Sequence, residues 1–133
     1  MGSFIFSGFA DEAGISVERQ MDVLEKNGIH MIEMRSVDGG HVIEKTENEL
    51  RILKEKLDKR GFSISAIGSP VGKSPIEEDF AIAKAKFLKS VNAAKSLGSK
   101  YIRAFSFFMP EEKDPMLFAD EVIRRMKELI QIA

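Results

Sequence analysis

The segment Phe62–Pro75, FSISAIGSPVGKSP, has the residue types of an anion-binding loop. Its alternating small and apolar residues predict a strand that ends near Ile67. Ser69, Lys73 and two glycines follow, and Ser74–Glu77 has the pattern of a helix N-cap, a first-turn proline and a capping-box glutamate. Because a strand here leads through backbone donors and one cation to a predicted helix N-terminus, the segment could bind phosphate or carboxylate.

Two features of this loop argue against a nucleotide-binding P-loop. Gly68 and Gly72 are separated by three residues, where that motif requires four. Pro70 also removes one of the backbone amides that a phosphate would need. The alternative for Lys73 is an ordinary solvated loop lysine.

Charged residues alternate with apolar ones in two further predicted strands. In His30–Ser36, Glu33 and Arg35 lie on the face opposite Ile32 and Met34. Arg103 lies in the predicted strand Lys100–Phe107. These three charges could line a polar ligand pocket, or they could form an interior ion pair that only fixes packing, because a buried charge needs a partner in either case.

Strand-end position selects the remaining candidates. Asp11 and Glu12 follow the predicted strand Ser3–Phe9, although an acidic pair before a helix also simply favours the positive end of that helix. Ser106 ends the fourth predicted strand. His41 is the one histidine on this side and the only candidate metal ligand, and a lone histidine without clustered carboxylates is poor evidence for a metal site.

The elements that position these residues are four strands, each followed by a helix. Apolar residues at helical spacing predict helices over 17–27, 47–60, 75–97 and 115–133, and Gly28, Gly61 and Gly98 end the first three. Consecutive strand–helix units are the signature of an α/β fold with a parallel sheet. We therefore predict one domain over residues 1–133.

Composition excludes several classes of protein. The chain has 133 residues, a net charge of −1 and no cysteine, so it offers no electrostatic case for binding nucleic acid, no disulfide framework and no thiolate metal site. No apolar run approaches the roughly 18 residues of a membrane span, which argues against a membrane partner. The cytoplasm is the expected compartment.

The apolar spacing of the last predicted helix still continues at Ile130–Ala133. We therefore expect the chain to stop before a fifth strand, at about half the length of a (β/α)8 barrel. Four parallel strands leave two unpaired edges, so we expect the chain to form a homodimer, to rearrange into an open doubly wound sheet, or to be completed by a C-terminal half.

Four stretches in this order resemble the N-terminal half of the xylose-isomerase-like TIM barrels, the sugar phosphate isomerase/epimerase family. They are Phe6–Glu12, Ile32–Arg35, Ala66–Lys73 and Ile102–Phe107. The resemblance implies a metal-dependent isomerase or epimerase of a sugar or sugar phosphate that moves a proton through an enediolate, with Mn, Mg, Zn or Co as the divalent metal.

The resemblance places the family's metal ligands on the later strands, which this chain lacks. It therefore implies that the chain alone is inactive, carries no catalytic residue and no metal, and supplies only part of the substrate pocket. The substrate-binding candidates are Asp11, Glu12, Glu33, Arg35, Ser69, Lys73, Arg103 and Ser106.

Two other functions remain open from the sequence. A non-catalytic module of four strand–helix units could dimerise to close a barrel. A flavodoxin-like open sheet could bind a phosphorylated cofactor at the loop 69–73.

Overall fold

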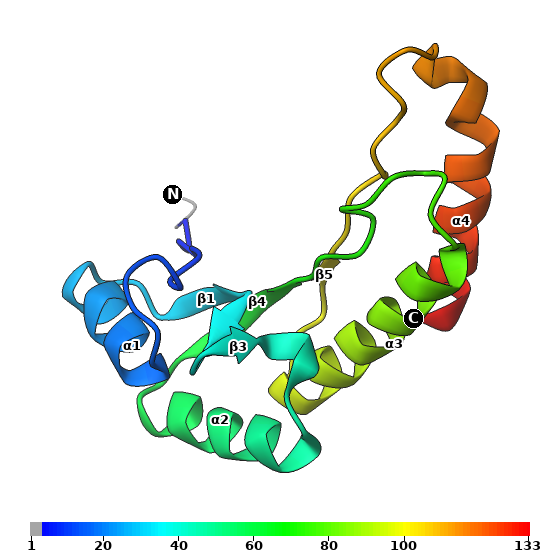
Figure 1. The fold of residues 1–133 in the computed structure, drawn as a ribbon. Helices are drawn as coiled ribbons and strands as arrows, with labels where there is room; N and C mark the ends of the chain where they lie inside the picture. Colours follow the sequence, from blue (N-terminus) through cyan, green and yellow to red (C-terminus); the bar gives the residue numbers. More distant parts are fainter. Residues whose placement is uncertain (1–3) are drawn as a thin grey trace.

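A computed structural model describes residues 4–133 as strands and helices that alternate along the chain (Figure 1). The α-helices are α1 (Val17–Lys26), α2 (Glu47–Lys59), α3 (Phe80–Leu97) and α4 (Ala119–Ile132). The strands are β1 (Met31–Met34), β2 (Ser36–Val37), β3 (Gly40–His41), β4 (Ser63–Gly68) and β5 (Ile102–Arg103). Two 3-10 helices, η1 (Val42–Glu44) and η2 (Pro115–Phe118), precede α2 and α4.

The main sheet is parallel and its strands follow one another in chain order. β1 pairs with β4, and β4 pairs with β5. On the other side of β1, Gly8 forms a parallel bridge to Ile32 and accepts a 3.0 Å hydrogen bond from the Glu33 amide. A flavodoxin-like sheet places its first strand between the second and third, so the sequential order contradicts that alternative.

The helices cover one face of the sheet, which confirms the predicted α/β architecture. Ile32, Met34 and Ile67 of the strands are fully buried in a hydrophobic cluster with apolar residues of α1, α2 and the end of α3. In Figure 1 α1 and α2 lie beneath β1 and β4, while the amino-terminal segment lies on the opposite side. No helix of the described residues covers this opposite face of the sheet, which we call the open face.

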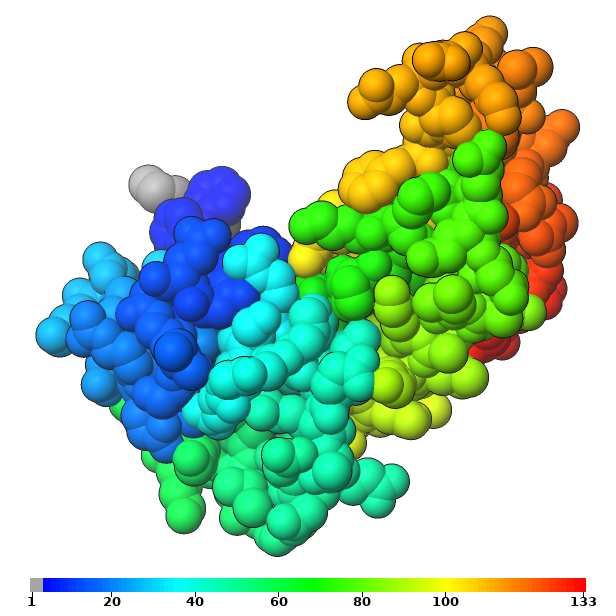
Figure 2. All heavy atoms as spheres, in the orientation of Figure 1, coloured from blue at the N-terminus to red at the C-terminus, as the bar shows by residue number. Residues whose placement is uncertain are grey.

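A second hydrophobic cluster lies at the far end of the molecule. It contains buried residues of α3, of the loop after β4 and of α4, and α3 therefore contributes to both clusters. Figure 2 shows the amino-terminal residues (blue) and the carboxyl-terminal residues (orange to red) at opposite ends.

The second cluster encloses a buried arginine. The guanidinium of Arg125 lies 5.1 Å from the centre of the Phe80 ring and 5.0 Å from that of Phe107. Its Nε donates a 2.7 Å hydrogen bond to Glu121, which balances the buried charge. This arrangement ties α4 to the start of α3.

The predicted helix ends are confirmed where local residues define them. Ser16 caps α1, Thr46 and Glu49 form the capping box of α2, and Gly98 ends α3 in the left-handed conformation at φ 72°. These motifs satisfy backbone groups within a few residues, so they do not depend on the rest of the fold.

The predicted start of the third helix is wrong. The helix begins at Phe80 behind the N-cap Asp79, instead of at Pro75 behind Ser74. Ser74 and Ile76 instead form backbone hydrogen bonds of 2.9 Å with Phe108, which keep the segment extended. The predicted helix N-terminus directly behind Lys73 is therefore absent.

Three predicted strands are shorter than expected, and one loop is structured. Ser3 of the segment Ser3–Phe9 lies outside the described residues, and the described part forms only the bridge at Gly8. The predicted strand Lys100–Phe107 contracts to β5, and His30–Ser36 to β1. Ser36, predicted as the end of that strand, instead pairs with His41 in the antiparallel hairpin β2–β3, which includes the segment 38–41 expected as a loop. No helix within residues 4–133 is long and apolar enough to span a membrane.

Candidate functional site

The charged residues of the strands meet on the open face of the sheet. Ile32 and Met34 of β1 point into the helix-covered core, so the intervening Glu33 and the following Arg35 lie on the opposite face. Arg103 at the end of β5 reaches the same place, because its Nε lies 3.2 Å from Glu33 Oε1. The structure thus brings together the three charges that the alternation predicts on one face.

Arg35 is held by the acidic pair that follows the amino-terminal segment. Its Nε and Nη2 donate hydrogen bonds of 2.6 and 2.8 Å to the two carboxylate oxygens of Asp11, and Nη2 lies 3.5 Å from Glu12. These hydrogen bonds from Arg35 hold the pKa of Asp11 below its ordinary value, and they raise the pKa of Arg35. The guanidinium of Arg35 is therefore occupied by protein groups.

Arg103 is held differently, between two aromatic rings. Its guanidinium carbon lies 5.2 Å from the centre of the Phe9 ring and 4.7 Å from that of Phe105. Phe9 also faces Arg35 at 4.8 Å, so four side chains stack in the order Arg35, Phe9, Arg103, Phe105. These cation–π contacts help to hold the Arg103 guanidinium in place.

The pairing of Arg103 with Glu33 is incomplete. The buried Nε of Arg103 makes no hydrogen bond, and it is the only such side-chain atom among residues 4–133. The side chains of Arg103 and Glu33 remain 31% and 25% exposed. Both side chains are thus partly exposed, so a ligand can reach this pair although its Nε atom is buried.

Gly68 makes the approach of these side chains feasible. A Cβ atom at this position would lie 2.9 Å from the Phe9 ring, 3.1 Å from Arg103 Nη2 and 3.2 Å from Arg35 Cβ. Real Cβ contacts are rarely that close, so any larger residue would displace the stack.

Three of the predicted residues lie apart from this cluster. Ser69 is 1% exposed, and its hydroxyl donates a 2.5 Å hydrogen bond to the Arg103 carbonyl and accepts one of 3.3 Å from the Val71 amide. Ser69 therefore holds the loop to β5. Lys73 and Ser106 are exposed, and within residues 4–133 no hydrogen bond or ion pair joins their side chains to the cluster.

His41 lies near the ends of these strands without forming a metal site. It caps η1, and burial lowers its pKa although a hydrogen bond with the Gly68 backbone opposes the shift. Among the described residues, no group of three or more His, Asp or Glu side chains is arranged to hold a metal ion.

Phe9, Phe105 and Gly68 of this cluster are not among the site residues predicted from the sequence. The same alternation that places Arg103 on the open face places Phe105, two residues later, on that face as well. Strand periodicity could therefore have found Phe105. The stacking itself depends on neighbouring strands and has no signal in the sequence.

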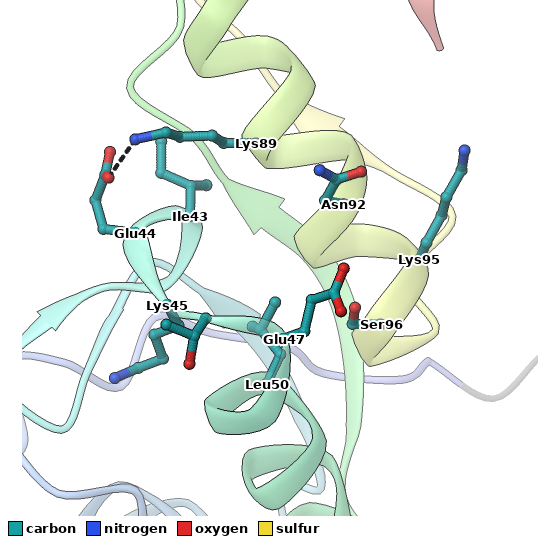
Figure 3. Close-up of a pocket in the computed structure, with 10 residues that line it drawn as sticks. Ile43, Glu44, Lys45, Glu47, Leu50, Lys89, Asn92, Lys95 and Ser96 are labelled. Carbon is teal, nitrogen blue, oxygen red and sulfur yellow. Dashed lines mark hydrogen bonds and ion pairs between the residues drawn. The ribbon is translucent and has the colours of Figure 1, made fainter.

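A sizeable cavity lies elsewhere, between η1, the start of α2 and the carboxyl-terminal half of α3. It has a volume of about 430 Å³ and contains the ion pair of Lys89 with Glu44 at 2.5 Å (Figure 3). Glu47 of α2 and Lys95 of α3 also line it. This groove belongs to the helix layer, whereas barrels of this kind act at the carboxyl ends of their strands. We therefore place the candidate site at the Arg103 cluster, which consists of Asp11, Glu12, Glu33, Arg35 and Arg103.

No protein-family model and no curated protein matches the sequence. Solved structures do match its fold. A D-psicose 3-epimerase in the presence of D-fructose has a TM-score of 0.71 at 17% identity, covering 96% of this chain and 48% of that chain. An IolI protein with a bound zinc atom has a TM-score of 0.70 at 20% identity, and the match covers 96% of this chain and 47% of that chain.

A xylose isomerase-like TIM barrel protein from Mycobacterium smegmatis, in complex with magnesium, has a TM-score of 0.66 at 14% identity. It covers 96% of this chain and 50% of that chain. The chain thus spans about half the length of each of these structures. Together with the sequential parallel strands, these matches show that the chain has the fold of half of a xylose isomerase-like TIM barrel.

Proposed function

We propose that this chain supplies part of the substrate pocket of a sugar isomerase or epimerase. The observation that carries the proposal is the pair of Arg103 and Glu33, exposed to ligand at the strand ends of a half-barrel of this fold. Asp11, Glu12 and Arg35 form the adjoining wall. Lys73 and Ser106 lie in the segments that follow β4 and β5, apart from the cluster, and they stay predicted substrate contacts.

In this proposal the reaction of the complete barrel is proton transfer through an enediolate, on a sugar or a sugar phosphate. Zinc and magnesium in two of the similar structures support a divalent metal for the complete barrel. Residues 4–133 form no metal-binding cluster. In this proposal the role of this half is to bind and orient the substrate, and turnover requires the complete barrel.

The proposal is tested in a protein that joins this half to the remaining strand–helix units. Arg103→Ala should lower kcat/KM for ketose epimerisation roughly tenfold to a hundredfold, because a charge-assisted contact to the substrate is lost. The matched control is Arg51→Ala, an exposed arginine of α2 that pairs with Glu55. Equal activity of the two variants would reject the proposed pocket.

The second candidate function is a structural module that closes a barrel by dimerising. The specific observation is the amino-terminal edge, where Phe4, Ile5 and Phe6 are 90%, 77% and 72% exposed. Apolar side chains on an unpaired edge favour association with another strand. Light scattering tests this function, since a defined dimer supports it and a monomer at high concentration rejects it.

A further inference from the structure

The charges of the Arg103 cluster do not favour the binding of an anionic ligand. Asp11, Glu12 and Glu33 oppose only Arg35 and Arg103, which gives a formal balance of −1 at neutral pH. Arg35 is already neutralised by two hydrogen bonds to Asp11. A phosphate at Arg103 would approach the carboxylate of Glu33, and like charges at such a distance repel.

The neighbouring loop offers little to an anion as well. Three of its amides donate within the loop or to the end of β4: Ser69 N donates to Ile67 O at 2.9 Å, Val71 N to Ser69 Oγ at 3.3 Å, and Lys73 N to Pro70 O at 3.0 Å. Pro70 has no amide hydrogen. A phosphate cradle needs several free amides that converge, and these three are engaged.

The same pair is well suited to hydroxyl groups. A hydroxyl both donates and accepts, and here a partly exposed guanidinium lies beside a partly exposed carboxylate, with 3.2 Å between Arg103 Nε and Glu33 Oε1. The rings of Phe9 and Phe105 contact the guanidinium, with 5.2 and 4.7 Å from its carbon to the ring centres, so the group is held in place before a ligand arrives.

We propose that Arg103 and Glu33 bind the uncharged, polyhydroxylated part of the substrate, and that this site takes a sugar in preference to its phosphate ester. The inference rests on the proposed function and narrows its substrate class. Arg103 donates to hydroxyl or carbonyl oxygens of the ligand, and Glu33 accepts from an adjacent hydroxyl.

The test is a set of NMR titrations of the chain, which follow the side-chain Nε–H signals of Arg103 and Arg35. The probes are D-fructose, D-fructose 6-phosphate and inorganic phosphate. We expect D-fructose to shift the Arg103 signal more than the Arg35 signal. We also expect the phosphate ester to bind more weakly than the sugar, and inorganic phosphate to leave both signals in place.

Glu33→Gln provides the matched variant, since it keeps the size of the side chain and removes the charge. It should raise the affinity for the phosphate ester relative to the sugar by at least about fivefold, because the repulsion is gone. Glu18→Gln is the control, because Glu18 pairs with Lys56 on the helix side. The backbone spectrum of each variant verifies its fold.

The outcomes separate the two proposals. If the unmodified chain binds the phosphate ester as tightly as the sugar or more tightly, with a shift at Arg103, the sugar preference is overturned and the proposed function stands. An Arg103 signal that no sugar or ester shifts overturns both. An unchanged preference in Glu33→Gln overturns the role given to Glu33.

Discussion

Replacing Gly72 with alanine should be far more damaging than the same change at a glycine of similar conformation. Gly72 has φ +75°, and a Cβ there would lie 1.9 Å from the carbonyl oxygen of Phe105. Gly39, in the β2–β3 turn, has φ +79° with no atom within 4 Å of such a Cβ. The two variants share the conformational cost, and only Gly72→Ala adds a collision with backbone.

The size of the difference follows from the contacts that the collision breaks. A left-handed alanine costs about 1–2 kcal/mol at either position. To clear the methyl group, the Phe105 backbone must move, which breaks the hydrogen bonds of Phe105 N to Val71 O (2.8 Å) and of Phe107 N to Gly72 O (3.0 Å). With about 1 kcal/mol for each, Gly72→Ala should destabilise the chain by about 3–4 kcal/mol.

Urea unfolding followed by far-ultraviolet circular dichroism measures this difference. With an m value of about 2 kcal/mol/M, the midpoint should fall by about 1.5–2 M for Gly72→Ala and by under about 1 M for Gly39→Ala. Because the ring of Phe105 stacks on Arg103, Gly72→Ala should also shift the Arg103 side-chain NMR signal. Midpoints that agree within about 0.3 M would refute the reasoning.

Three further predictions concern charges and caps. Asp11→Asn should lower the melting temperature at pH 7 and not at low pH. The hydrogen bond from Arg35 lowers the pKa of Asp11 below its ordinary value of 3.8 in the folded chain. The stabilisation by Arg35 is therefore present above pH 3.8 and is lost as the pH falls through the pKa of the folded state. Equal losses at pH 7 and pH 2 would contradict it. Arg124 and Arg125 lower the pKa of Glu121 from 4.5 to about 2. Glu121→Gln should therefore lower the stability of the chain above pH 4.5, and the difference in melting temperature from the parent should shrink toward pH 2. Thermal melts across that pH range check the sign of the effect. Thr46→Ala should lower the free energy of unfolding in urea by about 1 kcal/mol, because it removes the N-cap of α2. Thr46→Ser keeps the hydroxyl and should keep most of that stability. Equal losses in the two variants would show that the hydroxyl does not matter.

The parts of the fold that the sequence predicts are those governed by neighbouring residues. The buried face of α3, which includes Phe80, Phe87 and Val91, follows from helical spacing alone. The capping box at Thr46 is likewise confirmed, because its hydrogen bonds join residues three positions apart.

The wrongly predicted start of the third helix shows that contacts with a distant segment can override a local sequence pattern. Ser74–Glu77 has the residues of a capping box, but Ser74 O and Ile76 N bond to Phe108, which lies more than thirty residues later in the chain. A cap contributes about 1 kcal/mol, and two backbone hydrogen bonds together with the burial of Ile76 outweigh it. The partner strand that decides this is not visible in the local sequence.

The candidate site likewise combines features that the sequence predicts with features that it does not. Strand alternation is enough to place Glu33 and Arg103 on one face. It cannot show that the Ser69 hydroxyl is already bound to the Arg103 carbonyl, or that Phe9 lies between two guanidinium groups, because both depend on how separate strands align.

The helix α3 belongs to both hydrophobic clusters, and this has a consequence for how the chain unfolds. Ala93, Ala94 and Leu97 pack in the first cluster, and Phe80, Phe87 and others pack in the second. A continuous helix joins the two, where a flexible linker would let each open on its own. The ends of the molecule are therefore coupled as one cooperative unit, and amide exchange along α3 should proceed through a single opening that exposes both clusters together.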